Sequence, residues 1–223
     1  MLKIKNIFNG IDTFLSLKND YFEGNKNIDI LSKLSNKCEE NFDSKFCERI
    51  YTDILLMDHS VLDNNILFRS KLFFATKKLK KDDSSSILKL IDTTSEPESL
   101  KDAYLTLINY YKKKGDVKKE AKFYKQFSDR INMDSNILNG YAWRMTELKV
   151  NLIDALEKSI IAIDLASNYP ENQANIIDTK AEILWILDRH LDAIETINLA
   201  IDINPESSYF RSQKSKFQNS LKE

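Results

Sequence analysis

The residues that could carry chemistry are few and lie far apart. His59 and His190 are the two histidines, and neither has a second His or Cys at a spacing typical of a metal site. No serine lies in a Gly-x-Ser-x-Gly turn. Carboxylate pairs such as Asp82–Asp83 lie in polar segments, whereas a catalytic acid needs a dry pocket that shifts its pKa. We therefore predict that the protein is not an enzyme and needs no cofactor or metal.

The two cysteines do not form a recognisable motif either. Cys38 and Cys47 are nine residues apart in segments that read as helical, and no Cys-x-x-Cys occurs. We interpret them as two small apolar side chains, neither a metal site nor a redox pair. The basic N-terminus is interrupted by polar residues, and no window approaches 18 apolar residues, so we expect no leader, no membrane helix and a cytoplasmic location.

Composition narrows the fold to helices. The 223 residues include only 4 Gly and 3 Pro, too few for the turns of a β-sandwich or the Gly-rich loop of a Rossmann or P-loop fold. Lys and Arg total 33 against 34 Asp and Glu, which gives a net charge of −1. This near-neutral balance removes the main electrostatic argument for a general nucleic-acid binder.

Helical periodicity runs along almost the whole chain, with short breaks at Gly24, Gly115, Pro170 and Pro205. Loops this short imply antiparallel neighbours, and hence stacked helical hairpins. The predicted helices are 3–22, 27–40, 43–58, 63–80, 85–93, 99–113, 117–132, 135–148, 152–167, 173–187, 190–203 and 207–221.

The hairpins repeat. One set of apolar positions in a first helix recurs 34 residues later and again 39 residues after that. The three sets are Tyr104, Leu107, Ile108 and Tyr111; Leu138, Tyr141, Ala142 and Met145; and Ile177, Lys180, Ala181 and Leu184. The second helices also match, because Ala155 aligns with Ala193 and Ala162 with Ala200. Small residues at these places allow neighbouring helices to approach closely.

This pattern resembles the tetratricopeptide repeat (TPR) family. In the copy at 174–207, Ala181, Leu184, Ala193, Ala200 and Pro205 fall at the family's characteristic positions, whereas Lys180 departs from it. Two further copies, 101–134 and 135–170, bring the resemblance to residues 101–206. The resemblance implies an all-α, right-handed solenoid of antiparallel hairpins. Residues 1–100 would then be a helical region of degenerate hairpins, and 207–223 a capping helix with an apolar stripe.

In such a solenoid the first helices line the concave face, and the resemblance places eight side chains there. They are Asn109, Lys113, Asn139, Trp143, Glu147, Asp178, Glu182 and Trp185. Asn can bond a peptide backbone, and Trp gives a broad apolar contact, so the predicted function is a scaffold or adaptor that holds an extended peptide or a partner helix. Packing of both Trp side chains between repeats is the competing interpretation. Leu105 and Thr179 occupy places where the family's carboxylate clamps carry polar residues, so a basic or extended ligand fits better.

Two other functions stay open. The segments at 138–145 and 178–185 look like the helical region behind thioredoxin-like domains in some bacterial proteins, so the chain could be such a module with a redox partner.

Charge is also unevenly distributed along the chain: residues 60–131 hold 16 Lys and Arg against 10 Asp and Glu, and residues 135–206 hold 5 Lys and Arg against 12 Asp and Glu. Solvated helix faces, an RNA or acidic-partner edge at Lys112–Lys114, and head-to-tail self-association are all compatible with this asymmetry. The sequence names neither the partner nor the oligomeric state.

Overall fold

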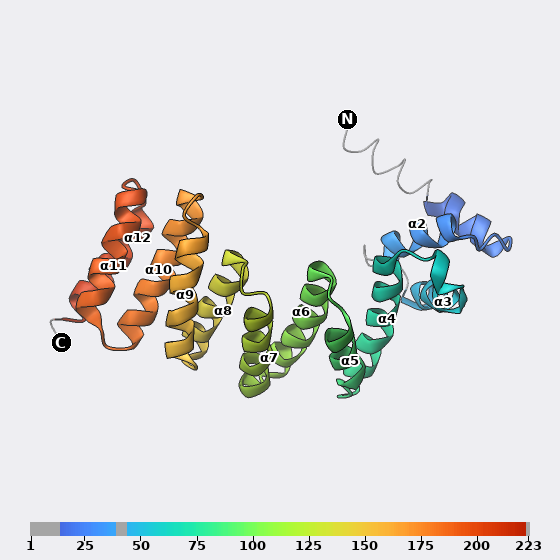
Figure 1. Cartoon of the computed structure of the whole chain (residues 1–223), viewed down its shortest axis with the longest axis horizontal. Coiled ribbons are helices and arrows are strands. Elements are labelled where there is room, and N and C mark those ends of the chain that lie inside the picture. The colour runs from blue at the N-terminus through green and yellow to red at the C-terminus, as the bar shows by residue number, and fades with distance from the viewer. Residues whose placement is uncertain (1–13, 39–43, 222–223) are drawn as a thin grey trace. The chain divides into compact units, whose positions relative to one another are not determined.

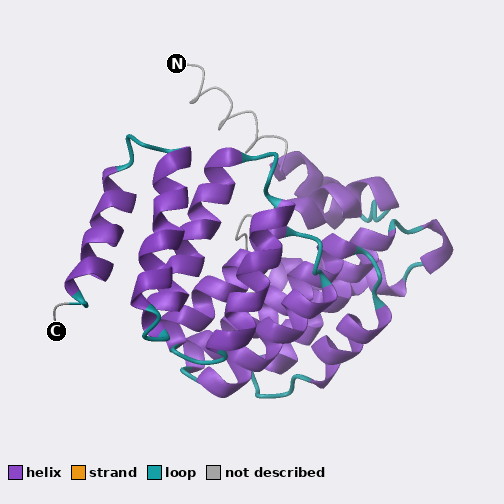
Figure 2. Ribbon diagram, turned by 60° about the vertical axis from the view of Figure 1, so that its left-hand side comes forward, coloured by secondary structure: helices purple, strands orange, loops and turns teal. Residues whose placement is uncertain are grey.

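The structure, a computed structural model, describes residues 14–38 and 44–221. Within these ranges every regular element is a helix, joined to the next by a short loop (Figure 2). The predicted all-α class is therefore confirmed. The predicted helix residues 3–13, 39, 40 and 43 lie outside the described ranges.

Helix bounds follow the predicted ones closely. Residues 14–22 are helical, and the elements after them are α2 (Ile28–Cys38), α3 (Ser44–Leu56), a short 3₁₀ turn η1 (His59–Val61), α4 (Asn64–Leu79), α5 (Ser85–Thr93), α6 (Pro97–Lys114), α7 (Val117–Arg130), α8 (Ser135–Leu148), α9 (Leu152–Leu165), α10 (Pro170–Ile186), α11 (His190–Ile203) and α12 (Ser208–Asn219). The main difference is that α6 and α10 begin at a proline, two and three residues before the predicted starts. Proline suits the first helical position, because that residue's N–H has no partner within the helix.

Side-chain caps explain why several helices start where they do. The Asp63 carboxylate accepts a hydrogen bond from the Asn65 amide at 2.8 Å, and Asp134 accepts one from the Asn136 amide at 2.8 Å. Ser207 Oγ accepts from the Phe210 amide at 3.3 Å and so caps the start of α12. Each bond satisfies an amide that the helix itself leaves unpaired.

The chain divides into two compact units, which we call the first unit (residues 1–106) and the second unit (residues 107–223). The boundary falls inside α6. In the first unit, α2, α3 and α4 pack around a core that includes Leu31, Leu34, Ile50 and Ile54, all fully buried.

The second unit is a row of hairpins. Each of the helices α8 to α12 packs against the next one in the chain, and α10 also contacts α8 (Figure 1). The matched small residues Ala155, Ala162, Ala193 and Ala200 are all fully buried, as close helix packing requires. Gly140 on α8 serves the same purpose, since a Cβ there would lie 2.9 Å from the Tyr124 hydroxyl of α7.

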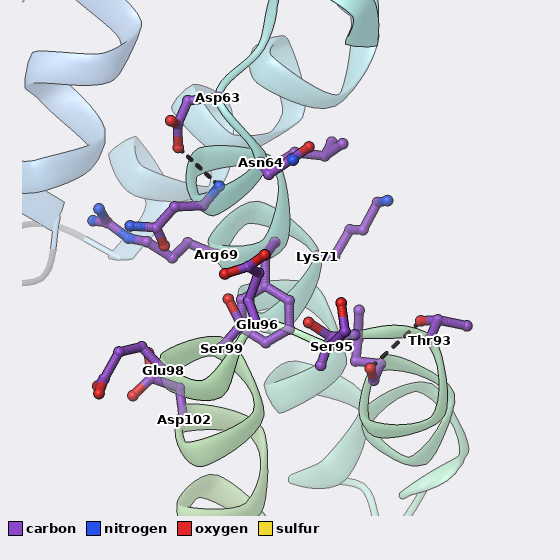
Figure 3. A pocket seen from close by; sticks show the side chains of 15 residues that line it. Asp63, Asn64, Arg69, Lys71, Thr93, Ser95, Glu96, Glu98, Ser99 and Asp102 are labelled. Atoms are coloured by element: carbon purple, nitrogen blue, oxygen red, sulfur yellow. Dashed lines mark hydrogen bonds between the residues drawn. The ribbon is translucent and has the colours of Figure 1, made fainter.

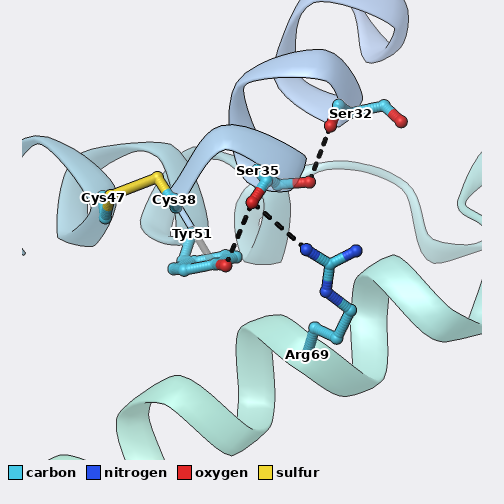
Figure 4. The surroundings of a disulfide bond; sticks show 6 residues. All are labelled: Ser32, Ser35, Cys38, Cys47, Tyr51 and Arg69. Atoms are coloured by element: carbon cyan, nitrogen blue, oxygen red, sulfur yellow. Dashed lines mark hydrogen bonds between the residues drawn. A yellow bond between two sulfur atoms is a disulfide. The ribbon is translucent and has the colours of Figure 1, made fainter. Parts of the chain in front are cut away.

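The cysteines form a disulfide, so the prediction that they are unlinked apolar side chains is wrong. Cys38 ends α2 and Cys47 lies in α3, and their Cα atoms are 5.6 Å apart because these two helices pack against each other (Figure 4). Beside the bridge, the Ser35 carbonyl accepts hydrogen bonds from Arg69 Nη2 at 3.2 Å and from the Tyr51 hydroxyl at 3.4 Å. The first unit is thus held at this point by a covalent link as well as by its core.

No helix in the described ranges is long and apolar enough to cross a membrane.

Candidate binding surfaces

The eight predicted groove residues, which we call the first-helix stripe, fall on α6, α8 and α10 of the second unit. On α6, Asn109 and Lys113 are exposed. On α8, Trp143 is 39% exposed, Glu147 is exposed and Asn139 is half-buried. These three α8 residues are spaced by four, so they share one helix face.

On α10, the carboxylates of the stripe contact the chain's own last helix. Asp178 is 6% exposed and accepts a hydrogen bond from the Tyr209 hydroxyl of α12 at 3.1 Å. Glu182 is 8% exposed, and its two oxygens lie 2.5 and 2.7 Å from Lys216 Nζ, also on α12. The capping helix therefore covers this end of the stripe, where we expected open side chains.

Trp185, the third stripe residue on α10, is also engaged by α12. Its indole N–H donates to Ser220 Oγ at 2.8 Å, and Lys216 Nζ lies 3.9 Å from the centre of its ring. The Phe217 ring centre is 6.1 Å away. The competing interpretation of Trp185, as a side chain packed between repeats, matches this geometry. The same interpretation does not match Trp143, which keeps an exposed face.

Burial raises the pKa values of Asp178 and Tyr209 where α10 meets α12. Burial raises the pKa of Asp178 to about 6, even though Tyr209 and Gln213 bond its charged form. The second oxygen of that carboxyl has no hydrogen-bond partner. Burial, together with the neighbouring Asp178 charge, raises the pKa of Tyr209 to about 12.

An ion pair fixes α8 against α7 beside Trp143. The Arg144 guanidinium binds both oxygens of Glu120, at 2.6 and 3.2 Å, and also Glu147 at 2.9 Å. The hydrogen bond to Glu120 is the main cause that raises the pKa of Arg144. Because Glu120 is only 1% exposed, this two-point pair holds the register of the two helices.

A second set of charges joins α7 to α9. Asp154 on α9 accepts a hydrogen bond from the Tyr141 hydroxyl at 2.5 Å and one from Lys125 on α7. Burial alone would raise the pKa of Asp154, but the hydrogen bonds from Lys125 and Tyr141 hold it below its ordinary value. Lys158 on α9 binds Asp129 on α7 in parallel. The periodicity of the sequence gave no signal for these links.

The Lys-rich residues fall in both units. Lys77 in the first unit pairs with Glu48 at 2.5 Å. In the second unit, Lys119 Nζ lies 4.9 Å from the Tyr111 ring centre and Lys122 Nζ lies 5.5 Å from that of Phe123. Part of this charge is thus placed over aromatic rings, and the RNA-binding or acidic-partner alternative stays a prediction.

A cavity in the first unit was not predicted. It has a volume of about 700 Å³ and lies among α4, α5 and the start of α6, with Asp63, Arg69, Glu96, Glu98 and Asp102 on its walls (Figure 3). Burial raises the pKa of Asp102, and the nearby Glu98 charge adds to the effect. Over the described ranges, no group of three or more His, Cys, Asp or Glu could hold a metal ion. The sequence could not reveal this cavity, because residues 26–100 carry no pattern that registers with the repeats.

Together, the stacked hairpins and the buried alanines at matched places define a TPR-like helical solenoid. A solved structure with this fold is that of YrrB, described as a TPR protein with an unusual peptide-binding site. The match has a TM-score of 0.55 and 15% sequence identity, and it covers 89% of this chain and 97% of the other. No family model and no curated protein matches the sequence. The likeness to YrrB establishes the fold, and the kinship with thioredoxin-linked regions stays a prediction.

Proposed function

We propose that the protein is a non-catalytic interaction module and that its first-helix stripe holds an extended peptide of a partner protein. The observation that carries the proposal is Trp143, which is 39% exposed at the centre of the α8 face between Asn139 and Glu147. A partly exposed Trp on a rigid helix gives a broad apolar contact and an N–H donor at low entropic cost. The peptide-binding site described for YrrB supports a ligand of this class.

The charges around Trp143 favour a neutral ligand. The nearest cation on α8, Arg144, already binds Glu120 and Glu147. Leu105 and Thr179 offer no charge to a terminal carboxylate. The proposed ligand therefore lies over α6 and α8, where Asn109 and Asn139 can bond its backbone, and not over the part of α10 that α12 covers.

The disulfide bears on where this interaction takes place. Disulfides persist in oxidising compartments and are rare in the cytosol. The Cys38–Cys47 bridge therefore weighs against the predicted cytoplasmic location and favours a partner met in an oxidising environment.

A peptide selection tests the proposal. A random peptide library displayed on phage would be selected against the full chain, and the enriched peptides measured by fluorescence anisotropy. We expect Trp143→Ala to weaken binding at least tenfold, because it removes the central apolar contact. Asn139→Ala should weaken it by a smaller factor.

The matched control is Leu56→Ala, an exposed apolar residue of the first unit that lies outside both proposed sites, which should change the affinity less than twofold. Circular dichroism would verify that every variant keeps its helix content. If no peptide is enriched, or if the enriched peptides bind Trp143→Ala as tightly as wild type, the first-helix stripe is not the binding surface.

A further inference from the structure

The outward faces of the second helices α9 and α11 carry one exposed pattern twice. Each helix presents two aliphatic side chains alternating with two carboxylates, and the members correspond at an interval of 38 residues. On α9 they are Ile153, Glu157, Ile161 and Asp164, and on α11 they are Leu191, Glu195, Leu199 and Asp202. We call these two sets the outer strips.

The aliphatic side chains of the outer strips are well exposed. Ile153 and Ile161 are 61% and 48% exposed, and Leu191 and Leu199 are 65% and 53% exposed. Ile160 adds a further 50%-exposed side chain on α9. Single exposed aliphatic residues are common, but four at matched positions on two successive hairpins, with Ile160 as a fifth, are more than a surface that meets only water requires.

The strips belong to the outside of the hairpins. On both helices the core is built from other positions, since the alanines at 155, 162, 193 and 200 are fully buried. Members of each strip are spaced by three or four residues, so they share one face of their helix. The two hairpins are successive copies of one unit, so the strips stand at equivalent places.

Charge on the strips has one sign. Their four carboxylates are exposed. The one Lys or Arg within α9 is Lys158, whose side chain is 11% exposed and bound to Asp129, and α11 contains neither Lys nor Arg. At the N-terminus of α11, Arg189 binds Asp192 at 2.6 Å. A partner of these strips must therefore supply the positive charge.

The preceding repeat does not share the pattern. On α7, the places that correspond to Ile153, Glu157 and Ile161 hold Lys118, Lys122 and Gln126, all exposed. Among the second helices α7, α9 and α11, the pattern thus occurs on α9 and α11. A second copy that docked through these three α7 side chains would supply charge but no aliphatic side chain to bury Ile153 or Leu199.

We propose that the outer strips of α9 and α11 dock a basic amphipathic helix of a partner protein. Aliphatic residues on one face of that helix contact Ile153, Ile161, Leu191 and Leu199, and Lys or Arg side chains at its edges meet the four carboxylates. Opposite charge speeds the encounter and makes it sensitive to salt, while apolar burial supplies most of the affinity. The site lies on the second helices and is independent of the first-helix stripe.

A designed peptide pair tests this proposal on the full chain. The probe is a fluorescent 14-residue helical peptide of Leu and Lys with Leu on one face, and its counterpart carries Glu in place of Lys. We expect the Leu/Lys peptide to bind and the Leu/Glu peptide not to bind. Glu157→Lys combined with Glu195→Lys should weaken binding at least tenfold, and Leu191→Ser combined with Leu199→Ser should do the same.

The matched control makes the same charge change elsewhere. Glu171 and Glu206 are exposed and lie outside the strips, so Glu171→Lys with Glu206→Lys should leave the affinity within twofold. Trp143→Ala should also leave it unchanged, which separates this site from the proposed peptide surface. All variants would be checked for helix content by circular dichroism.

Three results would overturn the proposal. An equal loss in the strip and control charge variants would mean general attraction to an acidic protein. Unchanged binding in the Leu191→Ser, Leu199→Ser variant would mean that the strips make no contact. Self-association in sedimentation experiments that the strip variants abolish would assign the surface to a second copy of the chain.

Discussion

The buried carboxyl of Asp178 makes the stability of the fold depend on pH. Its pKa is about 6 in the folded chain against an ordinary 3.8, because burial disfavours the charged form. Between these values the folded state holds a proton that the unfolded state has lost, so the free energy of unfolding falls as the pH rises through this window. The linked loss is about 3 kcal/mol by pH 7.

We therefore predict that Asp178→Asn raises the stability at pH 7.5 by about 1 to 3 kcal/mol and that the gain disappears near pH 4. The Asn oxygen still accepts the Tyr209 hydrogen bond, so the contact with α12 survives. Urea unfolding at both pH values measures the difference. Asp164→Asn, a change at an exposed carboxyl, is the control and should shift stability by less than about 0.5 kcal/mol at either pH. An equal gain at both pH values would disprove the assignment to Asp178 ionisation.

The Arg144–Glu120 pair depends on both partners. Arg144→Met leaves the Glu120 carboxylate buried without its cation, so we expect a loss of about 3 to 5 kcal/mol in chemical denaturation. Adding Glu120→Leu removes the stranded charge and should restore most of the loss. Glu147→Gln, which changes only the exposed arm of the network, should cost less than about 0.5 kcal/mol. A double variant as unstable as the single one would contradict this account.

At the scale of elements, the disulfide links two helices of the first unit across a sequence separation of nine residues. A loop of this length loses enough unfolded-state entropy to stabilise the fold by roughly 2 to 3 kcal/mol. We predict that Cys38→Ser with Cys47→Ser lowers the stability of the first unit by this amount, measured by native-state hydrogen exchange in α2 and α3.

A reductant provides the matched comparison. Adding dithiothreitol should produce the same loss in wild type and no further change in the double serine variant. If reduced and oxidised wild type exchange at the same rates, the disulfide does not contribute to stability.

Helix α12 acts as the next first helix of the solenoid. Phe210 and Phe217 are buried against α10 and α11, while Tyr209 and Leu221 of its predicted apolar stripe are about half exposed. Its polar side chains Tyr209 and Lys216, with Ser220 just after the helix, meet the stripe residues of α10. These side chains explain why the predicted stripe is covered on α10, whereas Trp143 on α8 keeps an exposed face.

At the scale of the whole molecule, each hairpin of the second unit contacts mainly its neighbours. We therefore expect the hairpins of this unit to unfold in steps and not all at once. Phe217→Ala removes a fully buried ring, and we predict a loss of about 3 to 5 kcal/mol at this end of the unit. Hydrogen exchange should accelerate most in α11 and α12, less in α8, and not at all in the first unit.

The exposed Leu221→Ala change serves as its control and should leave exchange unaltered. Uniform acceleration across all helices in Phe217→Ala would mean that the two units unfold as one, against the stepwise picture.

The sequence by itself determined the helices, their order and the repeat. These features depend on local causes: apolar periodicity, caps such as Ser207, proline at helix starts, and alanines where helices must approach. A repeat of local units then makes stacking the only way to bury the apolar faces, so the fold class follows without coordinates.

Only the tertiary structure determined which side chains remain exposed to a binding partner. The disulfide, the burial of Glu120 under Arg144, and the covering of Asp178, Glu182 and Trp185 by α12 all join residues on different helices, most of them 24 to 35 positions apart. No local pattern encodes such pairings, because each depends on how two helix faces meet and on how much water remains between them.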